Sequence, residues 1–438
     1  GITVQDRQND TNMQYYSTRN HAALFSLQEA AFRGLAPDGG LFMPAVIPHA
    51  DLEKVRELSE CSFSELSRYL TGLFFGDELP EARTNAIAAE ACRFPVPLKQ
   101  VGKDKYTLEL FHGPTFAFKD IGAGFMGHAL RALNRTAEET IILTATSGDT
   151  GSAVANGFYG IEGVKVVILY PDGQVSDLQE SQMATLGRNI FPLKVKGTFD
   201  DCQRIVKDIF SDADFRREKR VTSANSINIL RWIPQSFYYF HGWAQWVKAT
   251  GGQRPEIVVP SGNYGNLAAG LLAAKMGLPV KHFIAAANAN DIVPKYLRSG
   301  RFEPQPSVRT VANAMDVGNP SNFERIVDLF DNDFNAMTAR IGGYSCDDQT
   351  ILEAIRELYD RYGYLSDPHS AVGYKAACEF GIEGFWISTA HEAKFGEVIR
   401  TALGKEFPLP SGLHELPGKE KLFTRIEPST SSVENFIR

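Results

Sequence analysis

The sequence predicts an α/β protein with two open, sheet-based lobes behind a mostly helical N-terminal domain. From Tyr106 onward, short apolar runs rich in β-branched residues alternate with segments of helical periodicity. That alternation is typical of parallel sheets covered by helices on both faces. Before about Leu98, apolar residues instead recur at helical spacing. Polar and glycine-rich segments follow several predicted strands, which is where ligands bind in folds of this kind.

The first hundred residues are predicted to form an arm and a helical domain. Residues 1–12 are polar and lack apolar periodicity, so we expect a disordered arm or an expression remnant there. Gly34 is expected to stop the first helix, since glycine readily adopts the left-handed conformation that ends helices. The N-terminal domain is predicted to span residues 13–100, with helices over 24–31, 52–58 and 63–75.

Two α/β lobes are predicted to follow, at residues 101–220 and 221–438. The strands of the first lobe are expected at Thr107–Phe111, Thr140–Thr144, Val164–Tyr170 and Leu193–Lys196. The strands of the second lobe are expected at Glu256–Pro260, His282–Ala287 and Phe385–Thr389. Each lobe therefore contains one of the two glycine-rich turns described below.

The composition argues against several classes of protein. The net charge is −7 and no lysine- or arginine-rich run is present, so no nucleic-acid partner is expected. No apolar run reaches the length of a membrane span, so no membrane partner is expected either. The five cysteines are scattered and never form a CxxC pair, which favours reduced thiols and a cytoplasmic location. The histidines form neither an HxxxH nor an HExxH motif, so no catalytic metal is expected.

Lys119 is the first candidate catalytic residue, because it lies between a predicted strand and a predicted helix, among Phe116, Phe118 and Phe125. An apolar setting disfavours the ammonium form, so the pKa of the lysine falls and its free amine can form a Schiff base with a carbonyl cofactor. The alternative is a lysine that packs its stem on the aromatic rings and keeps its charge in water. Lys394 is the rival Schiff-base lysine, but its charged surroundings in the sequence favour a solvated side chain.

Two glycine-rich turns join strands to helices and are candidate anion sites. The first, Thr146–Ser152, offers backbone N–H groups and hydroxyls at a helix start, and it has the size to bind a carboxylate. The same residues also fit a helix capped by Ser147, Asp149 or Thr150, and both interpretations stay open. The second, Pro260–Asn266, lets the backbone fold around a phosphate and lacks the GxGxxG pattern of a dinucleotide site.

Two further polar segments complete the candidate site. Asn225–Arg231 combines amides, a hydroxyl and a guanidinium, and arginine is well shaped to bind a phosphate through two hydrogen bonds. The alternative for this segment is an exposed, polar helix start. Thr389 ends the last predicted strand, where its neutral hydroxyl could face a ring nitrogen. His391, two residues later, fits a core or capping role as well as a functional one.

The order of these motifs along the chain and their amino-acid sequences resemble those of a known family. A lysine in a strand-to-helix turn, an SGDTG loop, a later GNYGN loop and a final Ser-Thr strand end occur in that order. The chain thereby resembles the fold type II, or tryptophan synthase β-like, pyridoxal-phosphate enzymes. From about Met13 to beyond Lys394 it is similar to the threonine synthase family in its longer bacterial and fungal form, whereas the final stretch from Leu413 to Arg438 carries no recognised motif. The segments that carry this similarity are STRN, GLAPDGGLFMP, HGPTFAFKD, ATSGDTGSA, NSINILR, VVPSGNYGN, SDPHSA and TAHEAKF.

The resemblance implies a role for each motif. Lys119 would bind pyridoxal 5′-phosphate as a Schiff base and act as the catalytic residue, while Thr389 would face the pyridine nitrogen. The substrate carboxylate would be bound by Ser147, Gly148 and Thr150, and Asp149 would lie near the phenolic oxygen of the cofactor. Many relatives have asparagine where Asp149 stands, so we expect either a shared proton or a helix-capping role for this carboxylate. The cofactor phosphate would lie on Gly262, Asn263, Tyr264, Gly265 and Asn266.

The substrate phosphate requires a second anion pocket, because cofactor and substrate each carry a phosphate group. We assign it to Asn225, Ser226 and Arg231, on a helix expected to begin near Asn225. A cation beside a leaving phosphate helps most in the transition state, when charge builds on that group.

The resemblance implies an enzyme of threonine biosynthesis that converts O-phospho-L-homoserine and water to L-threonine and phosphate. The alternatives are a related pyridoxal-phosphate-dependent serine/threonine dehydratase or phospholyase, and a non-catalytic phosphate-binding protein of the same fold. The intact Lys119 and the complete NSINILR segment argue against the non-catalytic alternative. The sequence leaves open whether the protein is a monomer or a homodimer.

Overall fold

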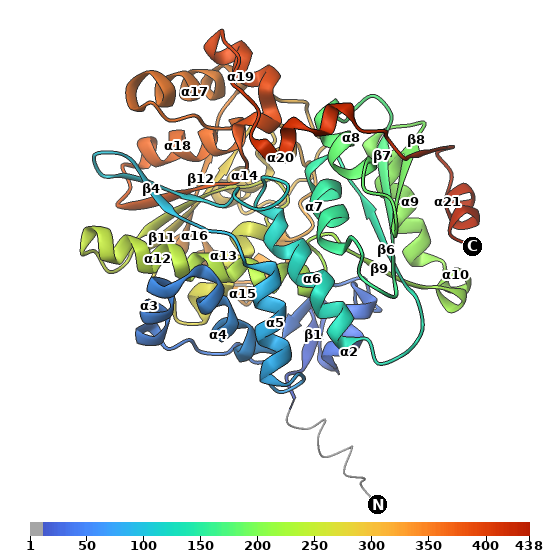
Figure 1. The fold of residues 1–438 in the computed structure, drawn as a ribbon. Coiled ribbons are helices and arrows are strands. Elements are labelled where there is room, and N and C mark those ends of the chain that lie inside the picture. Colours follow the sequence, from blue (N-terminus) through green and yellow to red (C-terminus); the bar gives the residue numbers. More distant parts are fainter. Residues whose placement is uncertain (1–11) are drawn as a thin grey trace, which may run out of the picture.

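Two sheets organise the computed structural model, which describes residues 12–438 (Figure 1). One sheet has six strands in the order β12-β11-β10-β13-β5-β4, and the other has five strands in the order β14-β8-β7-β6-β9. All neighbouring strands run parallel except β4 and β5. The predicted α/β class is therefore confirmed. The strands are β4 Leu98–Gly102, β5 Lys105–Glu109, β6 Thr140–Ala145, β7 Val164–Pro171, β8 Ile190–Val195, β9 Arg220–Ser223, β10 Glu256–Pro260, β11 His282–Ala287, β12 Ile341–Ser345, β13 Gly384–Ser388 and β14 Thr424–Ile426.

Helices cover both faces of the five-stranded sheet. Ile141, Leu143 and Val167 pack against one set of helices on the outer face, through a core that includes Ile205 and Val433. The alternate strand residues face inward, toward the helices that run between the two sheets in Figure 1. The outer helices are α9 Phe199–Ser211, α10 Ala213–Glu218 and α21 Thr430–Ile437, and the inner ones are α6 Lys119–Leu133, α7 Asp149–Phe158 and α8 Asp177–Ala184.

The six-stranded sheet is covered in the same way. Val258, Ile284 and Trp386 pack on the outer helices, whereas their neighbours Ile257 and Phe283 join the central core. This alternation follows from the period of two along a strand, so the central strands β10, β11 and β13 are apolar on both faces. The outer helices are α17 Asp348–Tyr362, α18 Pro368–Phe380 and α19 Gly396–Leu403, and the inner ones are α12 Phe237–Thr250 and α13 Gly265–Lys275.

The N-terminal region combines the predicted helices with a small sheet that was not predicted. Its antiparallel strands have the order β2-β1-β3 and are only three to six residues long. The expected first helix is shorter than predicted, because Leu24 lies in β2 and the helix starts after the N-cap Ser26. Gly34 ends that helix as predicted. The elements are β1 Tyr15–Ser17, β2 Asn20–Phe25, β3 Phe42–Pro44, α2 Leu27–Arg33, α3 Leu52–Cys61, α4 Phe63–Phe75 and α5 Glu81–Ala91.

The predicted arm at residues 1–12 lies outside the described residues except for Asn12. The Asn12 side chain donates a hydrogen bond of 2.8 Å to Glu78 Oε2. No helix among residues 12–438 combines the length and apolar character needed to cross a bilayer. The remaining described helices are α11 Ile229–Trp232, α14 Ile292–Ser299, α15 Phe323–Leu329, α16 Phe334–Arg340 and α20 Ser411–His414, with short 3-10 turns at Ile233–Ser236, Asn313–Met315, Glu392–Phe395 and Leu416–Gly418.

The two sheets do not follow the predicted boundaries at residues 101–220 and 221–438. Strands β4 and β5 precede the five-stranded sheet in the chain, yet β5 pairs with β13 in the six-stranded sheet. Conversely, β14 comes near the end of the chain and pairs with β8 in the five-stranded sheet. Pairing between segments this far apart leaves no local signal in the sequence, so contiguous boundaries could not capture it.

Candidate active site

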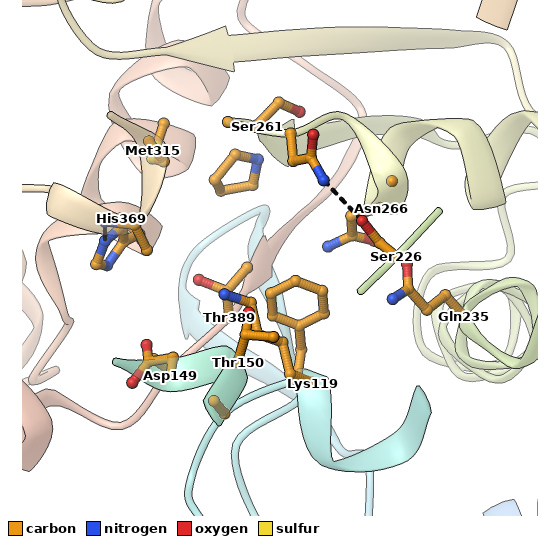
Figure 2. A pocket seen from close by; sticks show the side chains of 18 of the residues that line it. Lys119, Asp149, Thr150, Ser226, Gln235, Ser261, Asn266, Met315, His369 and Thr389 are labelled. Carbon is orange, nitrogen blue, oxygen red and sulfur yellow. Dashed lines mark hydrogen bonds between the residues drawn. The ribbon is translucent and has the colours of Figure 1, made fainter. Parts of the chain in front are cut away.

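A pocket lies beyond the carboxyl ends of strands from both sheets. Helices α6, α7 and α13 begin at this pocket, so the positive ends of their dipoles face one region. Most of the predicted site residues line it, but Ser147 and Gly148 do not: Ser147 is exposed to solvent and Gly148 packs on Gln179. Figure 2 shows how the labelled residues surround the space. The predicted residues in the lining are Lys119, Asp149, Thr150, Asn225, Ser226, Arg231, Gly262, Asn263, Tyr264, Gly265, Asn266 and Thr389.

Lys119 is the first residue of α6 and projects into this pocket, as the strand-to-helix position predicted. The turn before it is attached to the end of β13, because Phe118 N donates to Thr389 O at 2.8 Å and Ala117 pairs with Ala390. Burial lowers the pKa of Lys119 to about 8, with the charge of Asp149 opposing the shift. The uncharged amine is therefore far more populated near neutral pH than it is in a lysine in water, although the ammonium form still predominates.

Lys394 is fully buried, which corrects the expectation of a solvated side chain. Its Nζ lies 2.7 Å from Asp149 Oδ1 and donates to Thr115 O at 2.9 Å. Burial opposes ionisation of Asp149, but the fields of Lys394 and Lys119 outweigh it and lower the pKa of that carboxyl. Asp149 is thus an ionised partner of Lys394. The structure gives its side chain no capping bond at the start of α7. Because Lys394 is engaged twice and does not line the pocket, the geometry favours Lys119 as the Schiff-base lysine.

The Gly262–Asn266 turn connects β10 to α13 through a tight backbone path. Tyr264 has a left-handed backbone with φ 67° and precedes the first residue of the helix. A Cβ at Gly262 would lie 2.7 Å from Met315 Cα, so the close approach of another segment requires glycine there. Asn266 is buried, and its Nδ2 has no hydrogen-bond partner in the described structure. The turn therefore combines helix-start N–H groups with an unpaired side-chain donor facing the pocket.

The Asn225–Arg231 segment is arranged differently from the prediction. The helix α11 begins at Ile229, not near Asn225, because Asn228 is the N-cap and accepts from Leu230 N at 3.0 Å. Arg231 is only 2% exposed, so the alternative of an exposed helix start is wrong. Its Nη1 donates to Ala224 O at 2.7 Å, whereas its Nε has no partner in the described structure. Burial lowers the pKa of Arg231 to about 10, which leaves the guanidinium charged at neutral pH.

Thr389 is held after the end of β13 by a buried polar cluster at the start of α18 that the sequence analysis did not assign. Thr389 N donates to Ser370 Oγ at 2.9 Å, and Ser370 Oγ in turn donates to Asp367. His369 also lines the pocket, with its Nδ1 2.8 Å from Asp367 Oδ2 and its Nε2 accepting from Ala314 N at 3.0 Å. This pattern fixes the neutral Nδ1–H tautomer. The Asp-x-His spacing in SDPHSA was the available signal, but it does not reveal what the histidine faces.

The residues present fit pyridoxal 5′-phosphate. A lysine with a lowered pKa suits the aldehyde, and the Gly262–Asn266 turn has the donors that a phosphate needs. Gln235 lines the same pocket with an unpartnered Oε1, and Arg231 contributes an unpartnered Nε. Buried polar atoms are normally hydrogen-bonded, so unpaired ones around a pocket mark places where a ligand would bond. Among residues 12–438, no cluster of His, Cys, Asp and Glu has the arrangement of a metal site.

Three family models match the chain in succession. The model described as "Threonine synthase N terminus" matches residues 14–92, and the one described as "Pyridoxal-phosphate dependent enzyme" matches residues 91–384. The model described as "Threonine synthase, C-terminal" matches residues 370–437. The similarity therefore extends over nearly the whole chain, including the C-terminal stretch in which the sequence analysis found no motif.

Curated relatives and solved structures agree with these matches. Threonine synthase of Serratia marcescens is 44% identical over 404 residues, which are 92% of this chain and 93% of the relative. The corresponding protein of Escherichia coli (strain K12) is 43% identical over 406 residues, 92% and 94% of the two chains. The crystal structure of threonine synthase from Escherichia coli has a TM-score of 0.90 at 41% identity, covering 97% of this chain and 99% of that one. A threonine deaminase structure, with a TM-score of 0.52 at 18% identity over 70% of this chain and 97% of that one, is similar in fold alone.

Proposed function

The chain belongs to the threonine synthase family of pyridoxal-phosphate-dependent enzymes, and from this premise we propose that it converts O-phospho-L-homoserine and water to L-threonine and inorganic phosphate. The observation that carries the proposal is the pocket, which combines a lysine of lowered pKa with unpartnered donors on Asn266 and Arg231. The cytoplasmic location and the choice between monomer and homodimer stay predictions.

Lys119 is proposed as the group that moves protons on the substrate. When bound, pyridoxal phosphate supplies an electron sink that stabilises a carbanion next to the amino group. A lysine with a pKa of about 8 can accept and return protons near neutral pH, first at Cα and then at Cβ. Loss of these protons would allow the γ-phosphate to leave. Lys119 would then return one proton at Cγ, which becomes the methyl carbon, water would add its hydroxyl at Cβ, and Cα would regain a proton. The pocket walls from both sheets orient the substrate for these transfers.

The remaining lining residues are proposed to bind and orient. Thr150 and the start of α7 would hold the substrate carboxylate, while Asn225 and Arg231 would hold the phosphate that leaves. Thr389 would offer a neutral hydroxyl to the pyridine nitrogen, which leaves that nitrogen uncharged. Asp149 would keep its negative charge compensated by Lys394, so that a phenolic oxygen could lie near it without a shared proton.

A product analysis tests the proposed function. The holoenzyme is incubated with O-phospho-L-homoserine, and threonine, 2-oxobutanoate and phosphate are quantified. We expect threonine and phosphate in equal amounts, because water must add at Cβ for each phosphate released. A keto acid as the main product would favour the dehydratase or phospholyase alternative. Absence of any phosphate release would contradict an enzyme acting on this substrate.

Arg231→Ala is expected to lower kcat/KM for phosphohomoserine by about 10- to 100-fold while leaving cofactor content unchanged. The reason is the loss of a charge-assisted bond to the leaving phosphate, worth about 1.5–3 kcal/mol. Arg231→Lys should recover only part of the activity, because an ammonium lacks the two-pronged geometry of a guanidinium. Steady-state phosphate release and the absorbance of the bound cofactor measure both quantities. The exposed Arg217→Ala is the matched control, and loss of cofactor in Arg231→Ala would contradict the assignment.

A further inference from the structure

The hydroxyl of Ser226 receives two amide donors in the described structure. Asn263 Nδ2 donates to Ser226 Oγ at 2.7 Å, and Asn322 Nδ2 donates to it at 2.8 Å. Figure 2 marks a hydrogen bond at Ser226 with a dashed line. A hydroxyl has two lone pairs and one proton. Because both lone pairs are occupied, Ser226 can only act as a donor toward a third group, and it lines the pocket.

The direction of both amides is determined by their oxygen atoms. Asn263 Oδ1 accepts from Ser321 N at 3.0 Å and from Ser321 Oγ at 2.7 Å. Asn322 Oδ1 accepts from Arg325 Nη1 at 2.9 Å. An amide whose oxygen is engaged by a donor cannot flip without losing that bond. The hydrogen bonds to the two amide oxygens therefore orient the NH₂ groups of Asn263 and Asn322 toward Ser226.

Arg325 supports this arrangement as a buried cation. Its guanidinium donates to Ser226 O at 2.8 Å and to Ile227 O at 2.7 Å, and it stacks over the ring of Trp232. No described carboxylate lies within 4.0 Å of it, so carbonyl oxygens alone satisfy the charge. Burial lowers the pKa of Arg325 to about 9, and the group stays charged at neutral pH. A cation behind Ser226 polarises the chain of hydrogen bonds toward an anion in the pocket.

Ser226 lies against the start of α13, next to the turn that would bind the cofactor phosphate. A Cβ at Gly265 would be 3.2 Å from Ser226 Cβ and 3.3 Å from Asn322 Nδ2. We propose that Ser226 donates its proton to the phosphate of pyridoxal 5′-phosphate, not to the substrate phosphate, and that Asn322 is the positioning residue that directs it. The proposal rests on the cofactor of the proposed function and not on its reaction. It moves Ser226 out of the substrate-binding set predicted from the sequence.

The test compares two ligands that differ only in the phosphate. Dissociation constants of pyridoxal 5′-phosphate and of pyridoxal are measured by absorbance titration of the apo protein. Ser226→Ala removes the donor. Asn322→Asp keeps an acceptor for Arg325 but turns the serine proton toward the new carboxylate. Asn335→Asp, on the exposed side of α16, is the control for added charge.

Both test variants are expected to reduce the preference for pyridoxal 5′-phosphate over pyridoxal by about 10- to 100-fold, as expected for one charge-assisted hydrogen bond. Pyridoxal affinity and the control should stay unchanged. An unchanged preference in Ser226→Ala, or a raised KM for phosphohomoserine with normal cofactor affinity, would overturn the proposal. If the preference for pyridoxal 5′-phosphate falls in Ser226→Ala but not in Asn322→Asp, Asn322 does not position the serine hydroxyl. If the preference falls in both variants but the parent protein makes no threonine, the proposed function fails and this inference stands.

Discussion

Replacing Lys119 with alanine is expected to lower turnover of phosphohomoserine by on the order of 10⁴-fold. The side chain supplies both the amine that would attach the cofactor and the base that would move protons, so no neighbouring group replaces it. Lys394 cannot take over, because its Nζ already bonds Asp149 and Thr115. Phosphate release measures turnover, and loss of the absorbance of the attached cofactor reports the missing bond.

Borohydride reduction followed by peptide mass analysis checks which lysine carries the cofactor. In the parent protein, the mass of the reduced cofactor should appear on the peptide that contains Lys119. In Lys119→Ala, no lysine should be labelled. Label on Lys394 in the parent protein would contradict the assignment, and the exposed Lys207→Ala on α9 serves as the matched control.

Lys394→Met is expected to lower the free energy of unfolding by about 3–5 kcal/mol. Removal of the lysine leaves Asp149 buried and ionised without its hydrogen-bonded counter-charge, which is the costly way to break a buried ion pair. Denaturant unfolding of the apo protein measures the loss. The Lys207→Met variant, at an exposed position, should unfold like the parent.

The double variant Lys394→Met with Asp149→Asn separates the charge effect from lost packing. Because neither side chain is then charged, most of the stability should return. If the double variant is no more stable than Lys394→Met alone, the ion pair is not what stabilises this region. The single variant should also raise the pKa of Lys119, since Asp149 would then act on that amine without the opposing charge of Lys394.

The sequence predicted the central α/β elements well because their signals are local. Val164–Tyr170 and Glu256–Pro260 are near-continuous apolar runs with polar or glycine-containing ends, and both are strands. The helix over residues 63–75 is also where the periodicity placed it. The three-stranded N-terminal sheet was missed because its strands are short, and β2 is largely exposed and so lacks the alternation of a buried strand.

The candidate site was predictable where a residue type reveals its chemistry within one motif. Lys119 and the Gly262–Asn266 turn are examples, and both line the pocket. The partners of Asp149 and Ser226 were not predictable, because Lys394 and Asn322 lie far from them in the sequence. The charged residues next to Lys394 in the sequence predicted a solvated side chain. Its burial instead depends on Asp149 and Thr115, which are distant in the sequence and contact it only in the fold.

The position of β14 near the end of the chain affects how this protein can fold during its synthesis on the ribosome. β8 emerges early, but the partner along one of its edges, Thr424–Ile426, is synthesised on the order of tens of seconds later. β5 likewise cannot pair along one edge until β13 has been synthesised. During that interval each nascent sheet has an unpaired edge, and such edges pair readily with other chains. We therefore expect chaperone protection to matter during translation, and we expect a prematurely terminated chain that lacks residues 424–438 to aggregate.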